Sequence, residues 1–286
     1  MIQDEKQQLR RFIAAALAED VGEGDHTSLA TIPQGKTGEA QLIIKEPGVL
    51  AGVEEALAVL EQVDATLAVE VFKTDGQPVQ VGDVVLAVNG NIHSILIAER
   101  LLLNIMQRMS GIATATRRIV ALLEGTDTQV LDTRKTTPLL RFLEKKAVVA
   151  GGGVNHRFGL YDMILIKDNH VDYAGGIRAA VEKANRYRAT LDKPIAIEVE
   201  VRNLDEVRQV MEAGDVERIM LDNFDPEQVR EAVALINGRL VTEASGGITE
   251  ETVREYADAG VDYISMGALT HSVKSLDMSL KAKLLD

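Results

Sequence analysis

The sequence lacks cysteine and tryptophan, and only 3% of its residues are aromatic. The absence of cysteine excludes disulfides, thiolate metal ligands and cysteine nucleophiles, and such a chain needs no oxidising compartment, so we expect it in the cytoplasm. No run approaches the roughly 18 apolar residues of a membrane-spanning helix, so we expect no membrane association. The opening residues MIQDEKQQLRRFIAAALAED have an amphipathic helical pattern instead of the apolar block of a signal peptide.

The chain has fewer positive than negative side chains, 31 Lys and Arg against 44 Asp and Glu, so its formal net charge is -13. This balance argues against nucleic acid or an anionic membrane as the main partner. Between Arg100 and His170, however, 11 Lys or Arg face 6 Asp or Glu, a local charge of +5. A cationic middle in an acidic protein indicates a small, highly charged anionic ligand. Some of these cations fit a solvated helix face: Arg117, Arg118, Lys145 and Lys146.

The 286 residues are enough for two domains. Residues 1–112 mix helical patterns with the strands GEAQLIIKE, LAVEVFK and DVVLAV, without a regular rhythm, which indicates an α+β sandwich domain. A long helical pattern from His93 to Glu124, interrupted near Ser110 and Gly111, leads into the second domain. We expect a C-terminal helix over 272–286 to pack back on the first domain.

Residues 113–271 alternate apolar strands with helical patterns that end in glycine. Four strand ends carry Glu200, Asp222, Ser245 and Gly267, at separations of 22, 23 and 22 residues. This spacing predicts βα winding with a parallel sheet, and hence an α/β catalytic domain of the barrel type. From Thr128 onward only 159 residues remain, whereas a full barrel uses about 250. We therefore expect an open, incomplete β/α barrel of about six strands, whose gap a second subunit covers.

Two segments place cations where such a barrel binds ligands. The stretch LDTRKTTP puts Arg134 and Lys135 just after the first strand, and GGGVNHRFGLYDMILIKDNH puts His156 and Arg157 on a glycine-rich loop before a strand that ends in Lys167. Arginine pairs with a planar carboxylate through two parallel hydrogen bonds. Several arginines together indicate a substrate with more than one carboxylate. The remaining histidines, His26, His93 and His271, are interpreted as structural.

The last two strand ends, EASGGIT and SMGALT, each place glycines between a strand and a helical pattern. Glycine lets backbone N–H groups approach an anion, and phosphate sites recur after the final strands of this fold, although tight turns alone would also explain the glycines. Glu200 and Asp222 either form ion pairs or hold Mg²⁺. Glu200 is preferred over Glu198 because it lies nearer the mouth of the barrel.

Six motifs resemble the quinolinate phosphoribosyltransferase family: AERLLLNIMQRMSGIATAT, LDTRKTTP, AVVAGGGVNHRFGLYDMILIKDNH, EVEV, IMLDN and EASGGI. Their order spans essentially the whole chain. The resemblance implies ribose 5-phosphate transfer from phosphoribosyl pyrophosphate to quinolinate. Loss of the 2-carboxylate then gives nicotinate mononucleotide, pyrophosphate and CO₂ in NAD biosynthesis, with Mg²⁺ required.

The resemblance also assigns roles to residues of this chain. It implies quinolinate contacts for Arg100, Thr133, Arg134, His156, Arg157 and Lys167. It implies phosphoribosyl pyrophosphate contacts for Lys135, Lys167, Glu200, Asp222, Ser245, Gly246, Gly247, Met266, Gly267 and Ala268, with Lys135, Glu200 and Asp222 as catalytic residues. Mg²⁺ would be held by Glu200 and Asp222, directly or through ligand phosphates. Arg100 would reach a neighbouring subunit in a homodimer, and assembly of dimers into larger oligomers stays open.

Three alternatives were weighed. A relative of this architecture with another nitrogen acceptor, such as a molybdenum-locus homologue, would need fewer arginines. A barrel lyase or isomerase acting on sugar phosphates would explain the glycine turns with Glu200 and Asp222, but not Arg134, His156 and Arg157 together. A non-catalytic sensor of phosphorylated metabolites is disfavoured because no partner-binding module is evident.

Overall fold

The computed structural model describes the backbone of residues 2–283 and the side chains from residue 5 to residue 283. The chain forms two compact units, one of residues 1–115 with 273–286 and one of residues 116–272. The division falls a few residues after the expected boundary at 112 and 113. In the described part of the chain, no helix is both long and apolar enough to cross a membrane.

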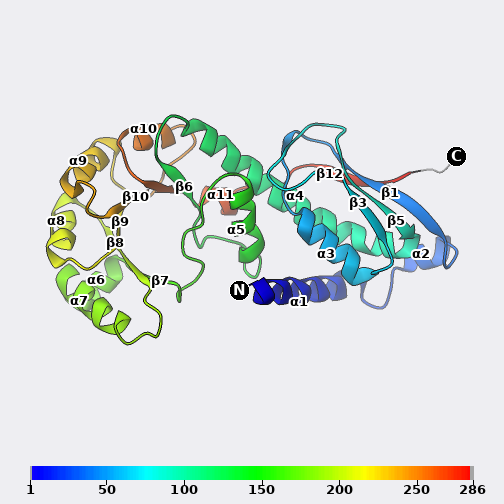
Figure 1. The fold of residues 1–286 in the computed structure, drawn as a ribbon, viewed down its shortest axis with the longest axis horizontal. Helices are drawn as coiled ribbons and strands as arrows, with labels where there is room; N and C mark the ends of the chain where they lie inside the picture. The colour runs from blue at the N-terminus through cyan, green and yellow to red at the C-terminus, as the bar shows by residue number, and fades with distance from the viewer. Residues whose placement is uncertain (1, 284–286) are drawn as a thin grey trace. The chain divides into compact units, whose positions relative to one another are not determined.

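The first unit contains a four-stranded antiparallel sheet in the order β12-β1-β5-β3 (Figure 1). Its strands are β1 (Thr37–Ile44), β2 (Gly48–Val49), β3 (Ala68–Val71), β4 (Pro78–Val79), β5 (Val84–Asn91) and β12 (Met278–Lys283), with β2 and β4 as a separate pair. Its helices are α1 (Ile2–Val21), α2 (His26–Thr31), α3 (Val53–Val63) and most of α4 (Ile92–Leu122). Alternating buried residues in β1, such as Leu42 and Ile44, form one apolar face.

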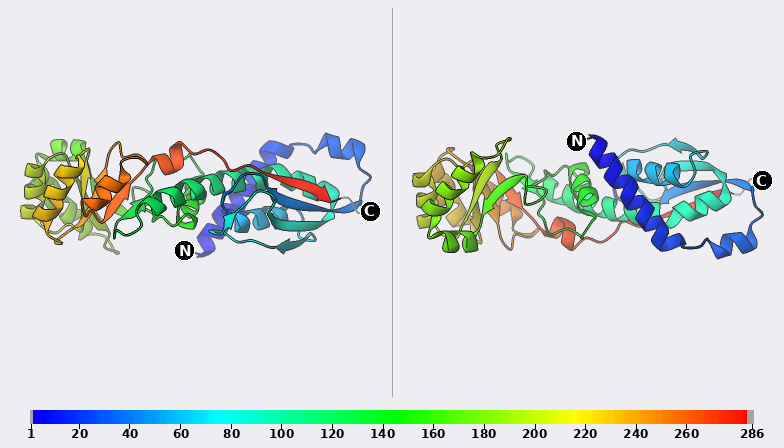
Figure 2. Two further views of the ribbon diagram at one scale, coloured as in Figure 1. Left: turned by 90° about the horizontal axis from the view of Figure 1, so that it is seen from above. Right: turned by 90° about the horizontal axis from the view of Figure 1, so that it is seen from below.

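The end of the chain is a strand, so the expected C-terminal helix over 272–286 is wrong for 278–283; residues 284–286 lie outside the described residues. β12 lies alongside β1 in Figure 2, and Leu280 pairs with Leu42. The expected interruption of the long helix is also wrong, because α4 runs unbroken through Ser110 and Gly111. A Cβ on Gly111 would lie 3.1 Å from the Cα of Ser275. The glycine therefore permits close backbone packing and does not end the helix.

The second unit is built on a six-stranded parallel sheet, which confirms the predicted α/β fold class and its strand number. The strands are β6 (Gln129–Leu131), β7 (Met163–Ile166), β8 (Ala196–Val201), β9 (Arg218–Asp222), β10 (Val241–Ser245) and β11 (Tyr263–Ser265). The helices are α5 (Arg141–Ala150), α6 (Asp168–Ala174), α7 (Ile177–Arg188), α8 (Leu204–Ala213), α9 (Pro226–Ile236), α10 (Val253–Asp258) and α11 (Ala268–His271).

Local sequence explains the regularity of this unit. Helix α9 begins with Pro226 at its first position and with Asp225 and Gln228 in a reciprocal capping box, and α8 is capped by the Asn203 side chain. Helices α7, α8 and α9 cover the outer side of the sheet in Figure 1. Strand β8 buries its valines completely, while Glu198 and Glu200 share the other strand face.

The barrel is open on one side. The sheet order runs β6-β11-β10-β9-β8-β7, and within residues 2–283 no ladder joins its two end strands. Beyond β6 the wall is extended only by an isolated bridge between Leu131 and Val154. The segment that follows Val154 carries His156 and Arg157 and leads to β7. The loop that carries His156 and Arg157 therefore lies at the open side of the barrel, between Val154 and β7.

Candidate functional site

The carboxyl ends of β7 to β10 bring together the acids and one cation predicted there. Asp222 pairs with Ser245 in the ladder between β9 and β10, so these two residues are direct neighbours. The Lys167 ammonium, at the end of β7, forms an ion pair with Glu200 of β8. The Asp222 carboxylate accepts a hydrogen bond of 2.7 Å from the Asn223 side chain. The predicted convergence of these strand ends is present in the structure.

The glycine turns approach their neighbours closely. Gly246 has φ +99°, and a Cβ there would lie 2.8 Å from the backbone N of Asn223. Gly247 also has positive φ, at +63°, and faces open space. The two glycines lie between β10 and helix α10, as expected, and α10 begins at Val253. A short loop therefore separates Gly247 from the helix.

Gly267 directly precedes α11 and lies against a predicted site residue. A Cβ on Gly267 would come within 2.9 Å of Lys135 Cδ. The Thr270 hydroxyl donates to the Lys135 carbonyl at 2.8 Å. Met266 is buried and Ala268 is exposed. The loop after the first barrel strand and the turn after the last therefore pack together, although 132 residues of sequence separate Lys135 from Gly267.

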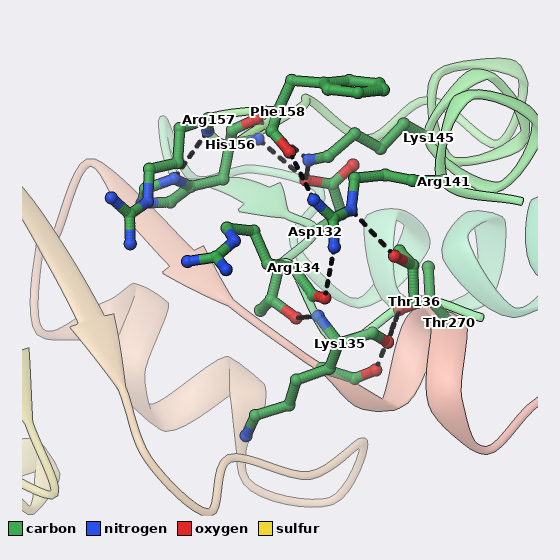
Figure 3. A network of polar contacts seen from close by, with 12 residues as sticks. Asp132, Arg134, Lys135, Thr136, Arg141, Lys145, His156, Arg157, Phe158 and Thr270 are labelled. Atoms are coloured by element: carbon green, nitrogen blue, oxygen red, sulfur yellow. Dashed lines mark hydrogen bonds and ion pairs between the residues drawn. The ribbon is translucent and has the colours of Figure 1, made fainter. Parts of the chain in front are cut away.

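Three cations project from two loops toward the same side, as Figure 3 shows for Arg134, Lys135 and Arg157. The backbone N–H of Lys135 donates to the Thr133 hydroxyl at 3.0 Å, which shapes the first of these loops. Burial and the nearby Arg134 charge lower the pKa of Arg157, while Glu198, Asp162 and Glu200 act in the opposite direction. Like charges held this close favour the binding of an anion between them.

A buried ion pair anchors the loop that carries Arg157. The Lys145 ammonium pairs with the Asp132 carboxylate and donates to the His156 carbonyl at 2.9 Å, and Asp132 accepts the His156 N–H at 2.8 Å (Figure 3). Lys145 is only 2% exposed, so its assignment to a solvated helix face is wrong. The other three cations assigned to such a face, Arg117, Arg118 and Lys146, are exposed.

A second arginine ties the two cationic loops to each other. The Arg141 guanidinium donates to the Thr136 hydroxyl at 2.9 Å, the Phe158 carbonyl at 2.9 Å and the Arg134 carbonyl at 3.3 Å (Figure 3). Its guanidinium carbon also lies 5.9 Å from the centre of the Phe158 ring. One side chain at the start of α5 therefore fixes the backbones that position Arg134 and Arg157.

His156 reaches into a buried acidic cluster instead of the open mouth. Its Nε2 lies 3.0 Å from Glu198 Oε2 and 3.3 Å from Glu243 Oε2, and both carboxylates are fully buried. Its Nδ1 accepts the backbone N–H of Arg157 at 2.6 Å. Both ring nitrogens thus face groups of the protein. A contact between His156 and quinolinate stays a prediction.

The charge balance of the cluster favours a proton over a metal ion, although its donor atoms lie within 4.8 Å of one another. Arg218 neutralises part of the negative charge, 3.2 Å from Glu243 Oε2 and 4.0 Å from Glu198 Oε1. The 3.0 Å contact at Nε2 has the length of an N–H···O hydrogen bond. Burial lowers the pKa of His156 and the facing carboxylates of Glu198 and Glu243 raise it. A second proton would have to sit on Nδ1, which accepts the Arg157 N–H at 2.6 Å, so the geometry favours the neutral ring with its proton on Nε2.

Arg100 lies on α4 in the first unit, and its side chain is exposed. Its contribution to a neighbouring subunit stays a prediction.

Sequence reasoning missed the buried charges that support the site: Asp132, Arg141, Lys145, Glu198, Arg218 and Glu243. One signal was present, because Glu198 and Glu243 alternate with apolar residues inside strands that otherwise read as buried. A charge inside such a strand requires a partner, and the partners come from a different loop and strand.

Comparisons with known proteins agree with this architecture. The N-terminal domain of quinolinate phosphoribosyl transferase matches residues 25–110, and its C-terminal domain matches residues 112–281. A chloroplastic nicotinate-nucleotide pyrophosphorylase [carboxylating] of Arabidopsis thaliana is 48% identical, over 96% of this chain and 82% of that protein. A probable enzyme of the same name from Bacillus subtilis is 43% identical, over 97% and 94%.

Solved structures give the same result. The crystal structure of NadC from Streptococcus pyogenes has a TM-score of 0.93 and 41% identity, covering 98% of each chain. The nicotinate-nucleotide pyrophosphorylase of Francisella tularensis has a TM-score of 0.91 and 39% identity, covering 97% of each chain. With both domains matched in order and relatives above 40% identity along nearly the whole length, the chain belongs to the quinolinate phosphoribosyl transferase family.

Proposed function

We infer that this chain is a carboxylating nicotinate-nucleotide pyrophosphorylase. It transfers the phosphoribosyl group of phosphoribosyl pyrophosphate to the nitrogen of quinolinate and releases pyrophosphate and CO₂, which forms nicotinate mononucleotide for NAD biosynthesis. The observation that carries this function is the projection of Arg134, Lys135 and Arg157 from two loops of an open barrel, with Arg157 near Arg134 and Glu200 and with Lys135 against Gly267. Purified protein with both substrates and Mg²⁺ should release one CO₂ for each mononucleotide formed.

Arg134, Arg157 and Lys167 are proposed to bind the quinolinate carboxylates. The two guanidinium groups project to one side (Figure 3), and each presents the fork of donors that matches a carboxylate. The Lys167 ammonium pairs with the Glu200 carboxylate in the structure, so it can pair with a quinolinate carboxylate when the substrate binds. Thr133 supports this site by accepting the N–H of Lys135. His156 is proposed to act behind Arg157.

Phosphoribosyl pyrophosphate is proposed to lie over the glycine turns. Gly246 and Gly247 have left-handed backbone conformations that expose N–H groups after β10, and Ser245 precedes them. Met266, Gly267 and Ala268 form the second turn, with Lys135 across Gly267. Lys135 would then lie between the pyridine ring and the pyrophosphate, where it stabilises the charge of the leaving group.

Glu200 and Asp222 are proposed to act below the ribose. Departure of pyrophosphate leaves positive charge at the anomeric carbon, and carboxylates on neighbouring strand ends stabilise it. Their oxygen donors also suit Mg²⁺, which binds through one or two carboxylates and completes its shell with water and ligand phosphates. Bound there, Mg²⁺ would supply neutralisation of the pyrophosphate. The transfer itself needs no covalent nucleophile from the chain, since positioning two polyanions overcomes most of the barrier.

Decarboxylation is proposed to follow from the substrate's own electronics. Once the ring nitrogen carries the ribose it is cationic, and its charge stabilises the electron pair that CO₂ leaves on the adjacent carbon. That carbon then takes a proton from solvent, which gives nicotinate mononucleotide. The cations around the carboxylates hold the ring in place during this step. We also propose the cytoplasm as the compartment, since a cysteine-free chain needs no oxidising environment.

A homodimer is proposed to complete the site, with Arg100 reaching the barrel of the partner. The open side of the barrel and the exposed Arg100 side chain support this arrangement. Arg100→Ala and Glu200→Gln should each be nearly inactive alone. If the site is shared, random mixed dimers should recover about a quarter of the wild-type activity, because half the dimers are mixed and one site in each is intact. No recovery in verified mixed dimers would place Arg100 in its own subunit.

A further inference from the structure

The acids inside the barrel have no role in the reaction described so far. Glu198 and Glu243 are 0% exposed, and the charged groups that lie against them are the His156 ring and Arg218. Burying two carboxylates costs free energy unless neighbouring groups compensate their charge. The groups that face these acids therefore indicate what the acids do. What they face is the imidazole of His156, whose other nitrogen contacts the residue proposed to bind quinolinate.

The imidazole ring of His156 connects the two acids to Arg157. The carboxylates of Glu198 and Glu243 lie at 3.0 and 3.3 Å from Nε2 of His156. The opposite ring nitrogen accepts the N–H of Arg157 at 2.6 Å, the contact drawn between these two residues in Figure 3. A nitrogen that accepts an N–H carries no proton in that contact, so the ring proton lies on Nε2, facing the acids. The acids therefore select the tautomer that lets His156 hold the Arg157 backbone.

We propose that Glu198, Glu243 and His156 form a positioning unit, in which the two carboxylates orient the imidazole and the imidazole fixes the backbone of Arg157 for binding of the substrate carboxylate. The inference rests on the proposed function, because it concerns how that site holds quinolinate. In this arrangement Arg157 is the residue that binds substrate, and the other three act through it. The guanidinium is tethered separately by a 3.3 Å bond to the Met163 carbonyl. Backbone and side chain of Arg157 are thus held from two directions.

The groups around the imidazole come from several elements. Glu198 of β8, Arg218 of β9, Glu243 of β10 and Ser265 of β11 line the barrel interior, and Asp132 and Lys145 hold the His156 backbone. Arg218 also stacks on Tyr263, with its guanidinium carbon 4.7 Å from the ring centre. A Glu→Gln change removes one negative charge but keeps the volume of the side chain, whereas a Glu→Ala change would also leave a cavity beside Arg218. Isosteric Glu→Gln changes are therefore suitable probes.

The test uses the full-length enzyme and separates the two substrates. Glu243→Gln should raise the quinolinate KM about tenfold and leave the phosphoribosyl pyrophosphate KM unchanged. Loss of a group that orients a ligand-binding residue typically costs about 10- to 100-fold, and tenfold is the lower end of that range. His156→Gln keeps an acceptor and a donor and should retain more quinolinate affinity than His156→Ala. Glu206→Gln is the matched control, because Glu206 is also a buried acid paired with an arginine but lies on α8. It should change neither KM.

A second measurement reports the ring directly. With ¹⁵N-labelled histidine, the spectrum should show a proton on Nε2 of His156 in the wild type, and Glu243→Gln should lower the pH at which that signal titrates. A folded Glu243→Gln variant with an unchanged quinolinate KM, or with both KM values raised equally, would overturn the inference, and so would an unchanged ring signal. If the wild type did not use quinolinate, the proposed function would fall, and the ring signal would still decide whether the acids orient His156.

Discussion

Arg157→Ala should raise the quinolinate KM and lower turnover, so that kcat/KM falls by about 100- to 1,000-fold, equivalent to about 3–4 kcal/mol. Arg157 is half-buried beside Arg134, where water competes poorly for its fork of donors. Two parallel charge-assisted bonds to a carboxylate are lost when the guanidinium is removed. Steady-state kinetics with each substrate varied in turn measure the effect, and the phosphoribosyl pyrophosphate KM should change little.

Two control variants sharpen this experiment. Arg157→Lys keeps the charge but not the fork, so its activity should lie between those of the wild type and the alanine variant. Arg178→Ala removes an exposed arginine on α7 that forms an ion pair with the exposed Glu182 of the same helix, and it should behave as wild type. Unchanged kinetics in a correctly folded Arg157→Ala protein would remove Arg157 from the quinolinate site.

Lys145→Met should destabilise the protein by about 3–5 kcal/mol, since it leaves the Asp132 carboxylate buried without its counter-charge. Burial raises the pKa of Asp132 and lowers the pKa of Lys145, so the folded protein holds this pair at a cost that their attraction offsets. The variant also loses the bond to the His156 carbonyl. We therefore expect a lower urea midpoint together with a higher quinolinate KM.

The adjacent residue supplies the control for this prediction. Lys146→Met changes the same residue type one position along α5, where the side chain is exposed, and should alter stability by less than about 0.5 kcal/mol. The double variant Asp132→Asn with Lys145→Met removes both charges and should recover part of the lost stability. Equal midpoints for the Lys145 and Lys146 single variants would show that the buried pair contributes little.

The barrel and its strand-end residues were predictable because their signals are local and periodic. Regular separations of about 22 residues placed Glu200, Asp222, Ser245 and Gly267 at matching strand ends, and the structure brings Asp222 and Ser245 into register. A parallel sheet converts regular spacing in sequence into proximity in space. The apolar strand patterns also predicted about six strands, and the sheet of the second unit has six.

The errors arose where a residue's environment depends on distant partners. Lys145 looks like Lys146 in sequence, and only Asp132, which lies on another element, makes one of them buried. β12 pairs with a strand more than 200 residues earlier, so no local pattern distinguishes it from a helix. Gly111 resembles a helix break until the 274–275 backbone lies against it. Each error therefore reflects a contact that is remote in the chain.

The pairing of β12 with β1 also constrains the order of events during protein synthesis. The first unit acquires its last strand only when residues 278–283 leave the ribosome, after the entire barrel has been translated. Until then one edge of β1 has no partner within the chain, and nascent polypeptides with such open edges are prone to mispairing. The sheet of the first unit therefore stays incomplete until β12 has been translated.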